Sequence, residues 1–134
     1  MNKLKVLVAD DHDGFRRLLA SFLGTQQGVE IVGEAANGIE AVNQTERLHP
    51  NLVLMDLDMP TIDGYEATRE IKHRSPSTRV VILSMHSGDE YRRRAWQNSA
   101  DGFIDKGSMK IALMTLLVNE QARLSGLPVG VHSA

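Results

Sequence analysis

The stretch Leu-Val-Leu-Met-Asp, residues 52–56, sets four consecutive apolar residues directly before a carboxylate. Consecutive rather than alternating apolar residues are typical of a strand that is covered on both faces, as in a parallel sheet flanked by helices. Two further runs of this kind and two other short apolar runs occur along the chain. The candidate strands are Leu4–Ala9, Val29–Gly33, Leu52–Met55, Val80–Leu83 and Gly102–Ile104.

The longer segments between these strands carry apolar residues three and four positions apart, which is the spacing of one helix face. Ser87 and Glu90 are spaced as a capping box, so the fourth helix should start just after Ser87. The residues expected to face inward are Phe15, Leu18, Leu19, Phe22 and Leu23 in the first helix, Ile39, Val42 and Thr45 in the second (Gly38–Leu48), and Ala67, Thr68 and Ile71 in the third, after Asp63-Gly64. For the last two helices they are Tyr91, Ala95 and Trp96, and then Ile111, Met114, Leu117 and Val118 after a cap at Ser108.

Strands and helices alternate strictly, and right-handed crossovers then give a doubly wound α/β fold. We expect a five-stranded parallel sheet in the order 2-1-3-4-5 with five helices, which is a flavodoxin-like arrangement. The 134 residues are the size of one domain, which we place at residues 1–124. No helical pattern is visible from Gly126 to Ala134, so residues 125–134 are expected to form a linker-like tail.

The composition disfavours several classes of protein. The net charge of −2 gives no overall attraction to nucleic acid or anionic lipid, so we expect this chain itself to bind no nucleic acid. No apolar stretch reaches the roughly 20 residues that a membrane span needs, and the apolar run near Met1 is too short for a secretory signal. Zero cysteines exclude disulfides and fit a reducing compartment. We therefore expect a cytoplasmic protein that does not bind membranes.

The side chains that carry chemistry in an open parallel sheet project from the carboxyl ends of its strands. Asp10 and Asp11 follow the first strand and Asp56 follows the third, and these strands are neighbours in the expected order. Three carboxylates so close together repel one another unless a cation lies among them. Mg²⁺ suits this site because it accepts one or two carboxylates and keeps positions open for phosphate oxygens. The sequence therefore predicts a magnesium site at which Asp56 is a nucleophile toward phosphorus.

Two more positions at this edge carry groups that such a reaction uses. Lys106, after the fifth strand, supplies a compact positive charge. The hydroxyl of Ser84, after the fourth strand, can donate a hydrogen bond to a phosphoryl oxygen. Both are therefore candidate catalytic residues beside Asp56.

Four motifs at this edge, taken together, resemble those of response-regulator receiver domains in two-component signalling systems. They are Val-Ala-Asp-Asp-His (8–12), Leu-Met-Asp-Leu-Asp-Met-Pro-Thr-Ile-Asp-Gly (54–64), Ile-Leu-Ser (82–84) and Gly-Phe-Ile-Asp-Lys (102–106). The resemblance covers residues 4 to about 122. Gly107 rather than proline follows Lys106, and this feature is most like the NarL/FixJ/LuxR branch, whose members usually continue into a helix-turn-helix domain.

The resemblance implies a role for each acidic residue. Asp56 is expected to be the phosphoacceptor, which forms an aspartyl phosphate with the help of Lys106. Mg²⁺ is expected to bind to Asp11, Asp56 and the backbone carbonyl of Asp58, while Asp10 acts through water.

The resemblance also implies a two-state signalling switch. Ser84 and Lys106 would sense the phosphoryl group, Phe103 stands at the aromatic switch position, and the face of the fourth helix, fifth strand and fifth helix would shift. The expected partners are a histidine kinase or phosphotransfer protein, and a second copy of the chain bound through that face or through the first and fifth helices. Asp58 and His86 would line the rim of the site and influence how long the phosphoryl group survives. The alternative for Asp58 is a loop residue that only caps or hydrates the turn before Pro60.

These implications favour a signalling protein over an enzyme with a separate substrate. The chain would catalyse its own phosphorylation and slow dephosphorylation, as the receiver part of a transcriptional response regulator or, alternatively, as a stand-alone regulator that acts by protein contact. A second alternative is a haloacid-dehalogenase-like phosphatase, suggested by Asp56-Leu57-Asp58, a nucleophilic aspartate with an acid two residues later. Those enzymes place further acidic ligands downstream of that motif, whereas Asp10 and Asp11 lie upstream of it.

Other conspicuous residues have simpler interpretations. Trp96 is expected to pack on its helix rather than to anchor a partner. The run Arg92-Arg93-Arg94 points in three directions around a helix, as on a solvated surface. The five histidines lack the spacing of metal ligands, so none is assigned to a metal site.

Overall fold

The structure, a computed structural model, describes residues 2–127 of the chain. Most of the expected C-terminal tail, residues 128–134, lies outside the described residues. A short 3₁₀ turn, Lys106–Ser108, separates the last strand from the last helix. The elements are β1 (Leu4–Ala9), α1 (Asp13–Gly24), β2 (Val29–Ala35), α2 (Gly38–Leu48), β3 (Leu52–Asp56), α3 (Gly64–Arg74), β4 (Arg79–Ser84), α4 (Asp89–Gln97), β5 (Gly102–Asp105) and α5 (Met109–Leu124).

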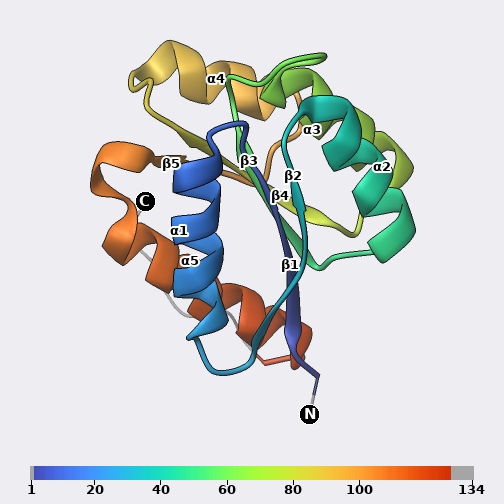
Figure 1. Ribbon diagram of the computed structural model, residues 1–134, viewed down its shortest axis with the longest axis vertical. Coiled ribbons are helices and arrows are strands. Elements are labelled where there is room, and N and C mark those ends of the chain that lie inside the picture. Colours follow the sequence, from blue (N-terminus) through green and yellow to red (C-terminus); the bar gives the residue numbers. More distant parts are fainter. Residues whose placement is uncertain (1, 128–134) are drawn as a thin grey trace.

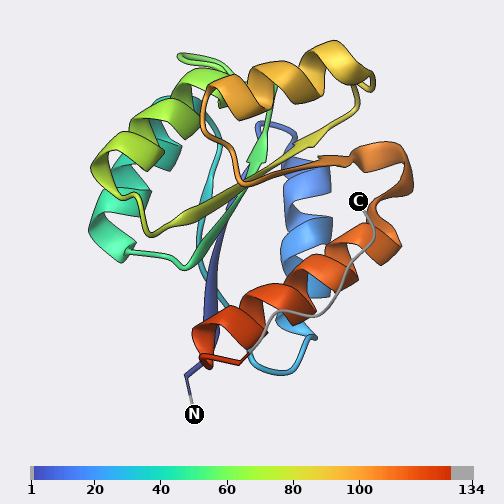
Figure 2. The same cartoon turned by 180° about the vertical axis from the view of Figure 1, so that it is seen from behind.

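The five strands form one parallel sheet in the order β2-β1-β3-β4-β5 (Figure 1), which confirms the expected fold class. Helices α1 and α5 cover one face of the sheet, and α2, α3 and α4 cover the other (Figures 1 and 2). Strands β1 and β3 are neighbours, and Ala9 lies opposite Met55. The carboxyl ends of these two strands therefore meet at the same edge of the sheet.

Two hydrophobic cores hold the layers together, one on each face of the sheet. Alternate side chains of β1 and β3 enter opposite cores, which explains why both faces of these strands are apolar. One core joins Leu7, Val53 and Met55 to Ala41, Ala67, Ile71 and Ala95 of α2, α3 and α4. The other joins Val6, Val8, Leu52 and Leu54 to Leu19, Leu23, Leu113 and Leu117 of α1 and α5.

The inward faces of four helices, α1, α2, α4 and α5, differ from the prediction. Leu18 in α1 is 68% exposed and Ile39 in α2 is 48% exposed, so these two predictions were wrong. In α5 only Leu117 of the expected set is buried, and the buried positions are Leu113, Leu117 and Glu120, while Ile111, Met114 and Val118 are exposed. Helix α5 carries apolar residues on more than one side, and spacing alone does not tell which of two apolar stripes faces the sheet.

The start of α4 and the caps also differ from the prediction. Helix α4 begins at Asp89, with Gly88 rather than Ser87 at its N-cap position, so the capping box was wrong. Gly88 has a φ of 125°, a conformation that glycine adopts without strain. Ser108 does stand at the N-cap of α5, but its side chain makes no capping hydrogen bond. Trp96 is 56% exposed and is therefore not packed away on its helix, as had been expected.

Gly64, the first residue of α3, lies directly behind the end of β3. A Cβ atom at this position would overlap the backbone carbonyl oxygen of Asp56 and would lie 2.8 Å from Cα of Leu57. We predict that Gly64→Ala lowers the free energy of unfolding by about 3 kcal/mol, because backbone atoms must move to admit the methyl group. Gly14→Ala in α1 is the matched control, since nothing lies within 4 Å of its added Cβ.

Urea unfolding of both variants measures this difference. The Gly14 variant should be as stable as the unchanged chain or slightly more stable, because alanine favours a helix over glycine. Equal stability of the two variants would contradict the tight fit of Gly64 against β3.

Candidate functional site

The predicted catalytic and metal-binding carboxylates, with Ser84 and Lys106, lie at the carboxyl edge of the sheet. Asp10 and Asp11 follow β1, Asp56 is the last residue of β3, and Ser84 is the last residue of β4. Lys106 follows β5 directly. Strands β3 and β4 each end one residue later than expected, so that Asp56 and Ser84 are paired within the sheet and are held by its hydrogen-bond ladder.

The structure brings the acidic residues together as one cluster. Asp10, Asp11, His12 and Asp56 each offer a ligand atom, and these atoms lie within 4.8 Å of one another. Asp10 is 2% and Asp56 is 4% exposed, so two carboxylates here are almost fully removed from water. Oδ1 of Asp11 and Oδ2 of Asp56 are buried without a hydrogen-bond partner.

Lys106 neutralises part of this charge. Its Nζ donates to Oδ2 of Asp10 at 2.7 Å and to Oδ1 of Asp56 at 3.0 Å, and its side chain is largely buried. Burial alone would lower the pKa of Lys106, but the hydrogen bonds and charges of Asp10 and Asp56 hold that pKa above its ordinary value. Lys106 is therefore charged at any physiological pH.

Asp56 is the carboxylate that differs most from an ordinary one. Burial, together with the neighbouring charge of Asp10, raises the pKa of Asp56 to about 6, although Lys106 opposes the shift. The site thus holds more negative charge than one lysine can balance. A further cation would relieve this excess.

The residues fit a hard divalent ion such as Mg²⁺. The two oxygens without a partner, on Asp11 and Asp56, are carboxylate oxygens, the ligand type that Mg²⁺ prefers. Within residues 2–127 neither oxygen accepts a hydrogen bond, although Nδ1 of His12 lies 3.2 Å from the Asp11 oxygen. Asp11 and Asp56 are two of the ligands that were predicted from the sequence, and the backbone carbonyl of Asp58 stays a prediction.

His12 is a member of the cluster that the sequence analysis did not single out. Its Nδ1 lies 3.2 Å from Oδ1 of Asp11 and 3.4 Å from Oδ1 of Asp10, while its backbone N–H donates to the same Asp10 oxygen at 2.8 Å. The side chain is 72% exposed. Its position directly after an acidic pair was the only sequence signal for this placement.

Ser84 and the two rim residues form a second group beside the cluster. The hydroxyl oxygen of Ser84 accepts the backbone N–H of His86 at 2.9 Å, which leaves the hydroxyl hydrogen free to donate elsewhere. Nε2 of His86 lies 2.8 Å from Oδ2 of Asp58, and its ring stacks on Tyr91 with the centroids 4.7 Å apart. The rim therefore connects the loop after β3 to helix α4.

Phe103 lies in β5 with its side chain turned inward and 8% exposed. The guanidinium carbon of Arg92 in α4 lies 5.0 Å from the centre of its ring. This contact links α4 to β5 on the face that was expected to shift.

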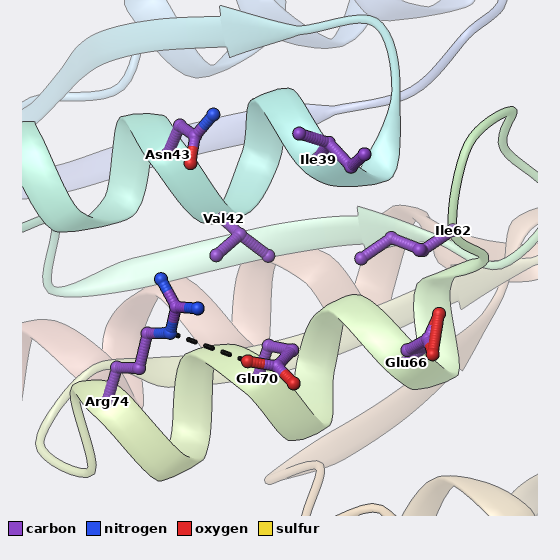
Figure 3. Close-up of a pocket in the computed structure, with 7 residues that line it drawn as sticks. All are labelled: Ile39, Val42, Asn43, Ile62, Glu66, Glu70 and Arg74. Carbon is purple, nitrogen blue, oxygen red and sulfur yellow. Dashed lines mark ion pairs between the residues drawn. The ribbon is translucent and has the colours of Figure 1, made fainter.

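A separate hollow of about 270 Å³ lies between α2 and α3 (Figure 3). Ile39, Val42 and Ile62 form its apolar part. At its edge, Nε of Arg74 lies 3.4 Å from Oε2 of Glu70, and both residues belong to α3. None of the carboxylates of the cluster lines it.

Within residues 2–127, no helix combines the length and the apolar character that a membrane crossing requires.

The raised pKa of Asp56 predicts a pH-dependent stability of the metal-free protein. The folded chain holds the Asp56 proton up to a pH of about 6, whereas an unfolded chain releases it near the ordinary value of 3.8. The contribution of this group therefore favours folding fully below pH 3.8 and is lost as the pH rises through about 6, a change of about 3 kcal/mol.

Asp56→Asn removes this dependence, so its stability relative to the unchanged chain should increase by about 2.4 kcal/mol between pH 4 and 7. Urea unfolding at both pH values, without divalent metal, measures the difference. If the stabilities of the two proteins change in parallel with pH, burial does not raise the pKa of Asp56.

Comparison with known proteins adds independent information. The family model of the response regulator receiver domain matches residues 6–118. The chain is 43% identical over 103 residues to response regulator protein VraR of Staphylococcus epidermidis, which covers 77% of this chain and 49% of that protein. It is 40% identical over 100 residues to the uncharacterized transcriptional regulatory protein YhcZ of Bacillus subtilis, covering 75% and 47%. The chain thus spans about half the length of these curated relatives.

A solved structure is similar over nearly the whole chain. It is a two-component response regulator of the LuxR family from Aurantimonas sp. SI85-9A1, with a TM-score of 0.83 and 29% sequence identity. The match covers 94% of this chain and 88% of that one.

Proposed function

The chain belongs to the response regulator receiver domain family, and we propose that the carboxylate of Asp56 is its phosphoacceptor. Receiver domains of this family are phosphorylation-dependent switches of two-component systems, and the similarity to VraR and to a LuxR-family regulator agrees with the branch expected from the motifs. The phosphatase alternative has no support in these similarities.

One observation carries the assignment to Asp56. It is buried at the end of β3, one of its oxygens is held by Lys106, and the other, Oδ2, has no partner. Asp56 is therefore the carboxylate of the site that is placed both to bind a divalent ion and to attack phosphorus. In this step a bond forms between a carboxylate oxygen of Asp56 and phosphorus. The bond from phosphorus to the donor atom breaks, and that atom, oxygen in acetyl phosphate or a ring nitrogen in a phosphohistidine, leaves with the electron pair.

Mg²⁺ supports the proposal through the charge balance of the site. Asp11, Asp56 and the backbone carbonyl of Asp58 would hold the ion, with Asp10 acting through water. When bound, the ion supplies positive charge that shields the carboxylates and the incoming phosphoryl oxygens from one another. Lys106 adds a second positive charge from the side of β5, and Ser84 can donate its free hydroxyl hydrogen to a phosphoryl oxygen.

The switch would start from these same contacts. A movement of Ser84 toward the phosphoryl group pulls on the loop before α4, because the Ser84 hydroxyl and the His86 backbone are hydrogen-bonded. Arg92 of α4 lies over the ring of Phe103. A change in the packing of Phe103 would therefore move the face formed by α4, β5 and α5.

Acetyl phosphate, a small phosphodonor, tests this function without any kinase. Incubation with the donor and Mg²⁺ should add one phosphoryl group per chain, detected by intact mass spectrometry, and omission of Mg²⁺ should prevent it. Continuous release of phosphate from a generic phosphate ester, without a stoichiometric adduct, would instead favour a phosphatase.

The natural donor would be a histidine kinase or a phosphotransfer protein, as in other two-component systems. The receiver would catalyse its own phosphorylation and slow dephosphorylation, with transcription as the regulated output. The match to about half of VraR and YhcZ supports a longer regulator. A reading frame that continues beyond Ala134 into a helix-turn-helix domain would support this, whereas an in-frame stop would leave a stand-alone regulator.

A second copy of the chain is a further proposed partner. An apolar groove between α1 and α5 is lined by Phe15, Leu18, Leu19, Phe22, Met109 and Leu113 together with Lys110. Leu18 is 68% exposed there, and a partner molecule would remove it from water. The exposed Trp96 and Ile111 mark the alternative face of α4, β5 and α5.

We predict that Leu18→Asp weakens dimerisation of the beryllofluoride-treated protein by about tenfold or more, because a charge replaces an apolar side chain that the proposed dimer would bury. Ile111→Asp is the matched control on the other face and should leave the dimer intact. Sedimentation velocity over a range of concentrations measures both. Loss of the dimer in the Ile111 variant alone would assign dimerisation to α4, β5 and α5 instead.

A further inference from the structure

Lys106 directs only two of its three N–H donors at oxygen. Its Nζ donates to Oδ2 of Asp10 at 2.7 Å and to Oδ1 of Asp56 at 3.0 Å. The ring of Phe15 lies on another side, with its centroid 4.3 Å from Nζ. Since the Lys106 side chain is only 7% exposed, the two carboxylates and the ring enclose the ammonium group.

We propose that Phe15 is a positioning residue for Lys106 in the phosphorylation of Asp56. The face of an aromatic ring is electrostatically negative and attracts an ammonium ion within about 6 Å of its centre, and more strongly where water is excluded. Lysine otherwise has a flexible stem that allows its charge to move away. This inference rests on the function proposed for Asp56.

The ring of Phe15 is itself held in place. Phe15 lies in the first turn of α1, where it packs against the core shared by α1 and α5 and lines the groove between them. Arg16, the residue after Phe15, is a cation that is held elsewhere. Its guanidinium donates to the backbone carbonyl of Asp10 at 2.7 Å and pairs with Asp13 and Glu34.

The ring matters most when the charges around Lys106 change. In the metal-free site, Asp10 and Asp56 hold the ammonium by themselves. Once a phosphoryl group and a divalent ion share these carboxylates, they bind Lys106 less strongly, whereas the attraction to the ring persists. An aliphatic side chain at position 15 would exclude water equally well, but it would not attract the charge.

A series of side chains at position 15 tests this. Phe15→Leu should slow phosphorylation by acetyl phosphate about fivefold, and Phe15→Tyr, which keeps the aromatic face, should stay within about twofold of the unchanged chain. Pentafluorophenylalanine at position 15 keeps the shape but reverses the charge of the ring face, so it should slow the reaction as leucine does. Phe22→Leu is the control, because it changes the same groove without touching Lys106.

The same comparison in a Lys106→Ala background separates positioning from packing. There the substitutions at position 15 should have no further effect on the rate, since no ammonium remains to be held. An undiminished effect of Phe15→Leu in that background, or equal rates for all side chains at position 15, would overturn the inference while Asp56 is still labelled. If the unchanged chain takes up no phosphoryl group at all, the proposed function itself fails.

Discussion

Asp56→Asn abolishes the one-to-one labelling of the chain by acetyl phosphate in the presence of Mg²⁺. The amide has no negatively charged oxygen to attack phosphorus, and no other carboxylate at the site has the same combination of a Lys106 contact and a buried oxygen without a partner. The amide also removes one charge from the divalent-ion site. Intact mass spectrometry at matched times for both proteins measures the loss.

Asp13→Asn is the control for this variant. Its carboxylate lies close to the site in sequence but is 64% exposed and pairs with Arg16, so labelling should proceed as in the unchanged chain. Equal labelling of the Asp56 variant would assign the phosphoryl group to another residue.

Lys106→Ala should have the second-largest effect, and it should change both the stability of the protein and its response to phosphorylation. In the metal-free protein it leaves the buried Asp10 and Asp56 carboxylates without their shared cation, which should lower the free energy of unfolding by about 3 kcal/mol. Mg²⁺ should restore part of this loss because it supplies positive charge to the same carboxylates. Lys110 is an exposed lysine one turn further on, so Lys110→Ala should change neither the free energy of unfolding nor its response to Mg²⁺.

The same variant should accept phosphate more slowly and fail to shift the α4 face. Trp96 is the single tryptophan of the chain and stands half exposed on α4, so its fluorescence reports on that face. Beryllofluoride with Mg²⁺ should change the fluorescence of the unchanged chain and leave that of the Lys106 variant almost constant. An undiminished fluorescence change in the variant would show that the signal reaches α4 without Lys106.

The sheet and the acidic cluster followed from the sequence because both depend on strand order and strand ends. A strand that is apolar on consecutive residues must be covered on both faces, and once β1 and β3 are neighbours, Asp10 and Asp56 have to meet. The register of β1 against β3 fixes which residues lie side by side at the strand ends. Strand ends were therefore the most predictable part of the molecule.

Contacts that depend on side-chain direction could not be predicted in this way. The buried stripe of α5 and the exposed one have similar spacing, so Ile111 and Leu113 could not be told apart without the sheet they face. The ring of Phe15 on Lys106 joins α1 to the end of β5, and nothing in the local pattern of either segment indicates it. The capping box failed because the loop before α4 places Gly88, not Ser87, at the helix start.

We propose above all that the carboxylate of Asp56 forms the bond to phosphorus. Borohydride reduces an acyl phosphate to an alcohol and thereby marks the carboxylate that carried it, and peptide mapping then locates the mark. After treatment with acetyl phosphate and Mg²⁺, the reduced residue should be Asp56, with no mark on Asp10 or Asp11. A mark on either of those residues, or phosphate that survives borohydride unchanged, would contradict it.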